Sequence, residues 1–181
     1  MLTTLNYSPN FDLKKRKAKD IKFIIFHYTG MKNEKQAITK LTDSNSKVSS
    51  HYLIKNNGEI ITLVPDLYVA WHAGISNWKK YKYLNKNSIG IEISNPGHNF
   101  NYKKFSKKQI FAIIKLSRFL IKKYKIQPNN FLGHSDIAPN RKSTWSLKIR
   151  SLYRRICCPS CVSRDEEREK RTSTTNKLRF C

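Results

Sequence analysis

The chain has 181 residues, enough for one domain with a hydrophobic core, with or without a tail. Lys and Arg number 36 against 12 Asp and Glu, and this formal net charge of +24 favours attraction to polyanions such as nucleic acid, anionic lipid or an anionic cell wall. No apolar run approaches the roughly 20 residues that span a bilayer, and the first residues lack the apolar stretch of a secretory signal. The basic residues are spread out without a recognisable nucleic-acid module, so we expect no specific nucleic-acid partner.

The first predicted element is a strand over residues 21–29, where a continuous β-branched and aromatic run is typical of a strand buried on both faces. His27 lies near its end. Residues 33–42 place Ala37, Ile38 and Leu41 at helical spacing, so a helix should pack on that strand. The chain therefore opens with a strand followed by a helix.

A β-hairpin is predicted next, with strands over residues 49–55 and 59–64 joined by an Asn-Asn-Gly turn at 56–58. His51 lies on its first strand, where a half-buried structural role and a functional role are equally plausible. The following AWHAG stretch at 70–74 predicts a compact loop. Its Trp71, together with Trp78, suits either core packing or stacking on a flat sugar or peptide.

Residues 88–95, SIGIEISN, alternate isoleucines with small or polar residues, which predicts a strand. Glu92 should point away from the face that the isoleucines bury. A carboxylate in the middle of a central strand is costly unless it is solvated, paired or near a metal. This position therefore favours a functional role for Glu92.

A long amphipathic helix is predicted over residues 106–124, with a basic solvated face and with Pro128 preventing its extension. Its apolar stripe comprises Ile110, Ile113, Ile114, Leu120, Ile121 and Tyr124. A short apolar stretch then leads into GHSDIAPNRK at 133–142, and we expect His134 to lie where a buried strand opens into a loop. A histidine there suits a metal ligand or catalytic group, although by itself it would more often be structural.

The composition changes abruptly after this stretch. Up to Asn140 the chain has 22 Lys, 2 Arg and 15 Asn, whereas from Arg141 onward it has 4 Lys, 8 Arg and 1 Asn. Folding does not demand such a switch, so we interpret the end as frameshifted or fused. We predict a domain over residues 1–142 and an aberrant basic tail over 143–181, irregular or disordered.

All four cysteines fall in this predicted tail, at Cys157, Cys158, Cys161 and Cys181. The predicted core therefore contains neither disulfides nor thiol ligands. The CPSC unit at 158–161 has the spacing of a zinc or redox motif but lacks a second pair to complete a metal cage. We interpret its spacing as coincidental.

Taken together, FHYT, SSHYLI, AWHAG, SIGIEISN and GHSDIAPNRK resemble the zinc-dependent N-acetylmuramoyl-L-alanine amidases of the amidase-2 group, the AmiD and AmpD type, which are related to peptidoglycan recognition proteins. The resemblance runs over residues 21–142, with the five motifs in order. It implies an α/β fold with a mixed central β-sheet flanked by helices. It also implies hydrolysis of the amide bond between N-acetylmuramic acid and L-alanine in peptidoglycan or a muropeptide.

The resemblance assigns roles to individual residues. His27 and His134 match two ligands of a Zn²⁺ ion, which would activate a water for attack on the amide. Glu92 matches the catalytic acid/base, and Lys142 matches a basic partner that steadies the oxyanion. The substrate groove would include Trp71, His72 and Asn95. His98 has no motif partner and is interpreted as a solvated loop histidine.

One position departs from the family pattern. Family members carry an Asp-Pro-Gly with the aspartate as third zinc ligand, and Thr144 occupies that position here. We therefore hypothesise an amidase scaffold with weakened metal binding and low or no activity. The alternatives are a non-catalytic peptidoglycan-binding module and a basic polyanion binder. We expect a monomer, and the sequence leaves open whether it is secreted, periplasmic or cytoplasmic.

Overall fold

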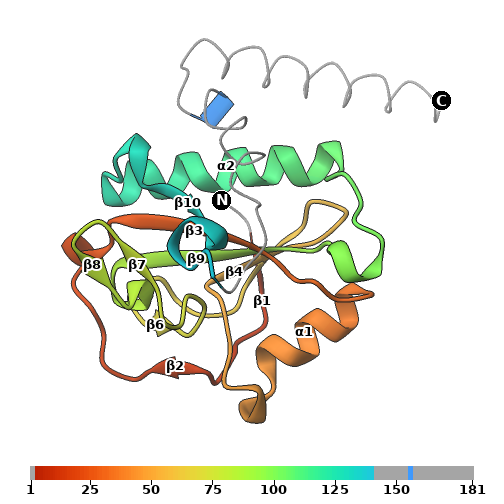
Figure 1. Ribbon diagram of the computed structural model, residues 1–181, viewed down its shortest axis with the longest axis horizontal. Coiled ribbons are helices and arrows are strands. Elements are labelled where there is room, and N and C mark those ends of the chain that lie inside the picture. Colours follow the sequence, from red (N-terminus) through yellow and green to blue (C-terminus); the bar gives the residue numbers. More distant parts are fainter. Residues whose placement is uncertain (1–2, 141–154, 157–181) are drawn as a thin grey trace, which may run out of the picture.

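The computed structural model describes residues 3–140 and 155–156. A mixed six-stranded sheet lies at its centre (Figure 1). In spatial order the strands are β1 (Thr4–Leu5), β5 (Ile60–Thr62), β4 (Tyr52–Ile54), β9 (Ser88–Ile93), β3 (Phe23–Tyr28) and β10 (Phe131–Gly133). Neighbouring strands run parallel except for the β4–β5 hairpin, which is antiparallel. The predicted α/β architecture with a mixed sheet is therefore confirmed.

Helices cover both faces of this sheet, and two small strand pairs lie beside it (Figure 1). The helices are α1 (Glu34–Thr42), α2 (Lys107–Tyr124) and the short α3 (His134–Ile137). Short 3-10 helices cover Ala18–Asp20, Ser44–Ser46, Leu84–Asn87, His98–Phe100 and Pro128–Asn130. The strand pairs are β2 (Phe11–Asp12) with β6 (Val69–Ala70), and β7 (Asn77–Trp78) with β8 (Tyr81–Lys82). Among the described residues, no helix is both long and apolar enough to cross a bilayer.

Helix α2 packs along one face of the sheet, which we call the α2 face. Ile89, Ile91 and Ile93 of β9 form its core together with the buried side of the helix. The buried stripe is centred on Ile113, Leu116 and Leu120, whereas the predicted members Ile110, Ile121 and Tyr124 lie at its partly buried edges. Ala112 and Leu116, which the predicted stripe lacked, are also buried.

The ends of α2 follow from local chemistry. Ser106 caps the N-terminus, where its hydroxyl accepts from the backbone N–H of Gln109 and the Gln109 side chain accepts from the backbone N–H of Ser106. At the other end Lys125 adopts the left-handed conformation, with φ +53°. The helix therefore ends at Tyr124, where it was predicted to end, four residues before Pro128.

The opposite face, which we call the site face, carries the polar residues of the central strands. Helix α1 covers one part of it, where Leu41 packs with Leu53 and Ile61. Phe23 and Ile25 of β3 form a second apolar cluster with the chain beyond β10. One local expectation was wrong: β10 runs directly into α3, so His134 begins a helix instead of a loop.

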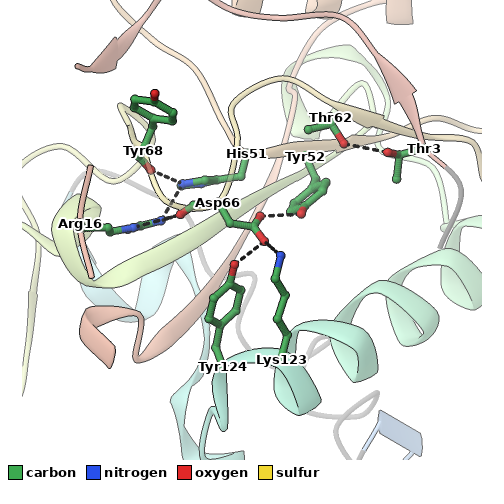
Figure 2. A network of polar contacts seen from close by, with 9 residues as sticks. All are labelled: Thr3, Arg16, His51, Tyr52, Thr62, Asp66, Tyr68, Lys123 and Tyr124. Carbon is green, nitrogen blue, oxygen red and sulfur yellow. Dashed lines mark hydrogen bonds and ion pairs between the residues drawn. The ribbon is translucent and has the colours of Figure 1, made fainter. Parts of the chain in front are cut away.

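A partly buried polar network at one end of the sheet joins the N-terminal segment to α2 (Figure 2). The Asp66 carboxylate accepts from the hydroxyls of Tyr52 and Tyr124 and from the Lys123 ammonium, which is 2.8 Å away. Lys123 belongs to the helix face that was predicted to be solvated. Burial raises the pKa of Tyr124 to about 12, so both its proton and the Asp66 contact persist at neutral pH. The network therefore fixes the end of α2 on the sheet.

The structure also describes two residues of the predicted tail, Arg155 and Ile156. Ile156 is only 4% exposed and packs into the core of the α2 face. Arg118 of α2 donates to the backbone carbonyls of both residues. The other residues from 141 onward lie outside the described part, as do all four cysteines, and with them most of the predicted irregular tail.

Candidate functional site

Two neighbouring strands bring the first pair of candidate residues together. His27 of β3 and Glu92 of β9 are paired in the register of the parallel strands. Alternation places Ile89, Ile91 and Ile93 on the α2 face, so Glu92 and its partner His27 lie on the site face. Both line the same cleft. The sequence predicted the direction of Glu92 correctly, but the pairing with His27 depends on the register of β3 against β9.

His134 approaches His27 from the next strand along. The Nδ1 atoms of the two rings are 2.9 Å apart, although the residues are 107 positions apart in the chain. The rings meet at 81°, edge to face. His134 reaches this place because β10 pairs in parallel with β3, and α3 starts directly at the end of β10. Two imidazole nitrogens therefore converge on one point beside Glu92.

His72 lies behind His27 and is 6% exposed. Its Nδ1 is 3.0 Å from Nε2 of His27, and its Nε2 is 3.2 Å from the Ser88 hydroxyl. The ring occupies the space beside Gly90, where an added Cβ would lie 2.4 Å from Cγ of His72. A side chain at position 90 would displace the His72 ring, so the glycine of SIGIEISN is needed for the histidine of AWHAG to occupy this place. The sequence did not reveal this dependence.

Hydrogen bonds to the Asn85 side chain anchor the loop that carries His72. Its Oδ1 accepts from the backbone N–H groups of His72 and Ala73, at 3.2 and 2.7 Å. Burial lowers the pKa of His72 well below the ordinary histidine value, and nearby His51 and Arg16 act in the same direction. His72 is therefore neutral at pH 7.

His51 directly precedes β4, one residue outside the strand on which it was predicted, and serves the framework. Its Nδ1 accepts from the backbone N–H of Gly90, and its Nε2 lies 3.1 Å from the Tyr68 carbonyl and 2.8 Å from Nη2 of Arg16. Burial, followed by the charge of Arg16, lowers the pKa of His51 well below its ordinary value. Figure 2 shows Arg16 against this ring, and its guanidinium also donates to backbone carbonyls, including that of Ser88 at 2.7 Å. His51 does not line the cleft.

The cleft over these residues has a volume of about 680 Å³, within the usual size range of ligand sites. Its floor is formed by His27, His72, Glu92 and His134. The walls come from the end of β3, from α1 and the segment after it, from the 71–74 loop and from residues 96–99. Lys40 and Lys47 give one wall a positive charge. These two lysines would attract anionic groups of a ligand.

The remaining predicted binding residues occupy different places. Trp71 lines the cleft, with its Nε1–H donating to Asp12 Oδ1 at 2.7 Å. Asn95 is buried outside the cleft lining; its Nδ2 donates to the Lys103 carbonyl and its Oδ1 accepts from Gly97 N–H, which shapes the wall at 96–99. His98 lines that wall with its ring stacked on Tyr102, at 5.3 Å between centroids. The sequence offered no motif for His98.

Lys142 and Thr144, the expected oxyanion partner and third-ligand position, lie outside the described residues. Within residues 3–140 and 155–156, no three His, Cys, Asp or Glu side chains cluster closely enough to hold a metal. The described part therefore provides two imidazole donors, His27 and His134, at the convergence point. A third protein ligand would have to come from elsewhere in the chain.

The chain is similar in sequence to known amidases. The sequence profile of the N-acetylmuramoyl-L-alanine amidase family (Amidase_2) matches residues 17–146. AmiD of Escherichia coli (strain K12), an N-acetylmuramoyl-L-alanine amidase, is 42% identical over 134 residues, covering 67% of this chain and 48% of AmiD. The 1,6-anhydro-N-acetylmuramyl-L-alanine amidase AmpD of Haemophilus influenzae (strain ATCC 51907 / DSM 11121 / KW20 / Rd) is 31% identical over 153 residues, covering 75% of this chain and 80% of AmpD.

A solved structure gives the same relationship in three dimensions. The complex of E. coli AmiD with the substrate anhydro-N-acetylmuramic acid-L-Ala-D-gamma-Glu-L-Lys superposes with a TM-score of 0.62 at 38% identity, covering 72% of this chain and 55% of AmiD. This chain thus spans about half the length of AmiD. By its profile match, its relatives and its fold, the chain belongs to the N-acetylmuramoyl-L-alanine amidase family.

Proposed function

We propose that this chain is a peptidoglycan amidase that hydrolyses the amide bond between N-acetylmuramic acid and L-alanine. The observation that carries the proposal is the convergence of His27 and His134 beside Glu92, at the floor of one cleft. The relatives support the substrate class, because AmiD was solved with an anhydromuramoyl peptide. The cleft is large enough for a muramoyl group with part of its stem peptide.

The donor set fits Zn²⁺. Imidazole nitrogens are good zinc ligands at about 2.0–2.1 Å, and two on one ion stand roughly 3.3 Å apart. The 2.9 Å between the two Nδ1 atoms is close to that spacing. His27 and His134 would hold the ion, which when bound supplies Lewis-acid activation of water and of the amide carbonyl. We propose Zn²⁺ as the cofactor on these two residues.

Glu92 has the geometry of a general acid/base. It lies next to His27 in the strand register, is half-buried and opens into the cleft. Its carboxylate can take a proton from the attacking water and return it to the nitrogen of the departing L-alanine, so that the amide C–N bond breaks with no net change in Glu92. Lys142 keeps its predicted role of stabilising the negative charge that develops on the carbonyl oxygen.

The cleft walls suggest how the substrate is held. Lys40 and Lys47 would attract the carboxylates of the stem peptide, and Trp71 presents an aromatic surface to the sugar or peptide. His72 and Asn95 would contribute mainly by holding the floor and the 96–99 wall in place. We also propose that the chain acts as a monomer and that its amidase-like domain covers residues 1–142, with Ile156 of the following segment packed against it.

The activity is tested by incubating the full chain with purified peptidoglycan and, separately, with an anhydromuramoyl peptide. We expect release of the stem peptide from at least one of them, loss of release after chelation and recovery on adding Zn²⁺. Retention on peptidoglycan without peptide release by zinc-loaded protein would instead support a non-catalytic binding module. Salt-sensitive retention on DNA, with no peptidoglycan binding, would support the polyanion binder.

The third ligand is tested with Thr144→Asp, with Ser143→Asp as the matched control. A carboxylate completes a three-ligand zinc site, whereas a neutral hydroxyl is a poor ligand. We therefore expect Thr144→Asp alone to raise both the zinc bound per chain after dialysis and the rate of peptide release. Equal stoichiometric zinc in the wild type and in Thr144→Asp would refute the idea that the site is impaired.

A further inference from the structure

The strongest unassigned feature is the hydrogen-bonded chain that runs from the backbone of the 3-10 helix Leu84–Asn87 through Ser88 and His72 to His27. Each member is buried, with exposures of 0% for Ser88, 6% for His72 and 5% for His27. Hydrogen-bonded partners of this kind set which nitrogen of a metal-binding histidine carries its proton. The Leu84 carbonyl can only accept a hydrogen bond, and this fixes which atom donates and which accepts in each of the other contacts.

The fixed end is the Leu84 carbonyl. The Ser88 Oγ lies 2.6 Å from it, and a carbonyl can only accept, so the single hydroxyl proton of Ser88 must point at Leu84. Without that proton, two oxygens would face each other at close range. Toward His72, at 3.2 Å, Ser88 can therefore act only as an acceptor. The proton of His72 accordingly lies on Nε2.

The position of the His27 proton follows in the same way. A neutral imidazole has one N–H, so Nδ1 of His72 is a lone pair. It lies 3.0 Å from Nε2 of His27, and this contact is favourable only if His27 is the donor. The Nδ1 of His27, the atom that faces His134, is then left without a proton. In the metal-free chain the 2.9 Å contact between the two Nδ1 atoms therefore has His134 as its donor, and His134 must give up this proton before its own Nδ1 can bind an ion.

We propose that His72 is a positioning residue: through the Leu84–Ser88–His72–His27 chain it holds the His27 proton on Nε2 and presents the bare Nδ1 toward His134 as a preformed cation ligand. This inference rests on the proposed metal site for its functional meaning. It reassigns His72 from substrate contact to control of a ligand. Gly90 takes part by leaving the space that the His72 ring fills.

The direct test is nitrogen NMR of the metal-free full chain labelled with ¹⁵N-histidine, which distinguishes bare from protonated ring nitrogens. The sequence has only five histidines, so each ring can be assigned by single replacement. We expect the wild type to show His27 protonated on Nε2 and bare on Nδ1. A wild-type His27 protonated on Nδ1 would overturn the proposal, whatever the chain hydrolyses.

Variants separate the effect of the His72–His27 hydrogen bond from the effect of packing by the His72 ring. His72→Phe keeps a ring but removes the acceptor, so the His27 tautomers should mix and the zinc dissociation constant should rise about 10–100-fold. His72→Asn keeps an acceptor near the Nδ1 position and should restore the wild-type tautomer and much of the affinity. Ser88→Ala, a smaller change, should shift the tautomers in the same direction as His72→Phe.

A failure of the positioning role can be told apart from a failure of the proposed amidase activity. A folded His72→Phe protein with an unchanged His27 tautomer and an unchanged zinc dissociation constant would refute the positioning role. If His72→Phe does not fold, the wild-type and Ser88→Ala spectra decide the matter. If the chain releases no peptide, the tautomer measurement still stands, because it uses neither metal nor substrate.

Discussion

The two faces of β9 have opposite compositions and opposite tasks. On the α2 face, Ile89, Ile91 and Ile93 are fully buried against α2. On the site face, the alternate residues are Ser88, Gly90 and Glu92, which respectively anchor His72, make room for its ring and line the cleft. Apolar packing therefore lies on one side of a single strand and the proposed chemistry on the other, so adjacent substitutions should have separable effects.

The sharpest test of this separation is Glu92→Gln. The change keeps the size of the side chain but removes the acid/base group, so the rate of peptide release should fall about 100–10,000-fold. The free energy of unfolding and the zinc content should stay near wild type. Glu59→Gln, on the β4–β5 hairpin, is the control and should leave the rate unchanged. A Glu92→Gln enzyme with near wild-type rate would remove Glu92 from the mechanism.

The adjacent residue should behave in the opposite way. Ile91→Ala opens a cavity in the core under α2 and should lower the free energy of unfolding by about 2–5 kcal/mol in denaturant titrations. The zinc affinity of the folded fraction should hardly change, because Ile91 points away from the site face. Ile75→Ala is the surface control, since Ile75 is 70% exposed. A folded Ile91→Ala protein that had lost zinc would show that the two faces are coupled.

Two buried histidines on the site face should make the free energy of unfolding depend on pH. Burial lowers the folded-state pKa of His51 and His72 well below 6.5, so as pH falls below 6.5 the unfolded chain takes up protons that the folded chain does not. Stability is thus complete above pH 6.5 and declines below it, by about 1.4 kcal/mol per pH unit for each histidine. Denaturant titrations between pH 5 and 6.5 measure this slope.

Replacing His51 shows how much of this pH dependence comes from each of the two histidines. His51→Asn keeps a polar side chain that can accept from Gly90 N–H but no longer titrates, so it should roughly halve the pH slope that the pair contributes, even if it lowers stability at pH 7. An unchanged slope would mean that His51 takes up its proton in the folded chain as readily as in the unfolded chain.

Much of the framework was readable from local patterns. The β3 strand, α1, the β4–β5 hairpin and α2 all appeared at or within three residues of the predicted ranges. The alternation of SIGIEISN also predicted which way Glu92 points. These features succeed because periodicity and capping act over a few neighbouring residues. The short strands β1, β2, β6, β7 and β8 were missed, since two-residue strands have too little periodic signal.

The chemical types available for a site, namely imidazoles at positions 27, 72 and 134 and a carboxylate at 92, were set by the amino-acid sequence alone, as was the α/β class. Only the tertiary structure decided that His27 pairs with Glu92, that His134 meets His27 at 2.9 Å, and that His72 fills the space beside Gly90 while His51 belongs to the framework. The reason is physical. Which strands pair, and in which register, depends on packing between segments far apart in the chain, and a shift of one residue would turn each of these side chains to the opposite face.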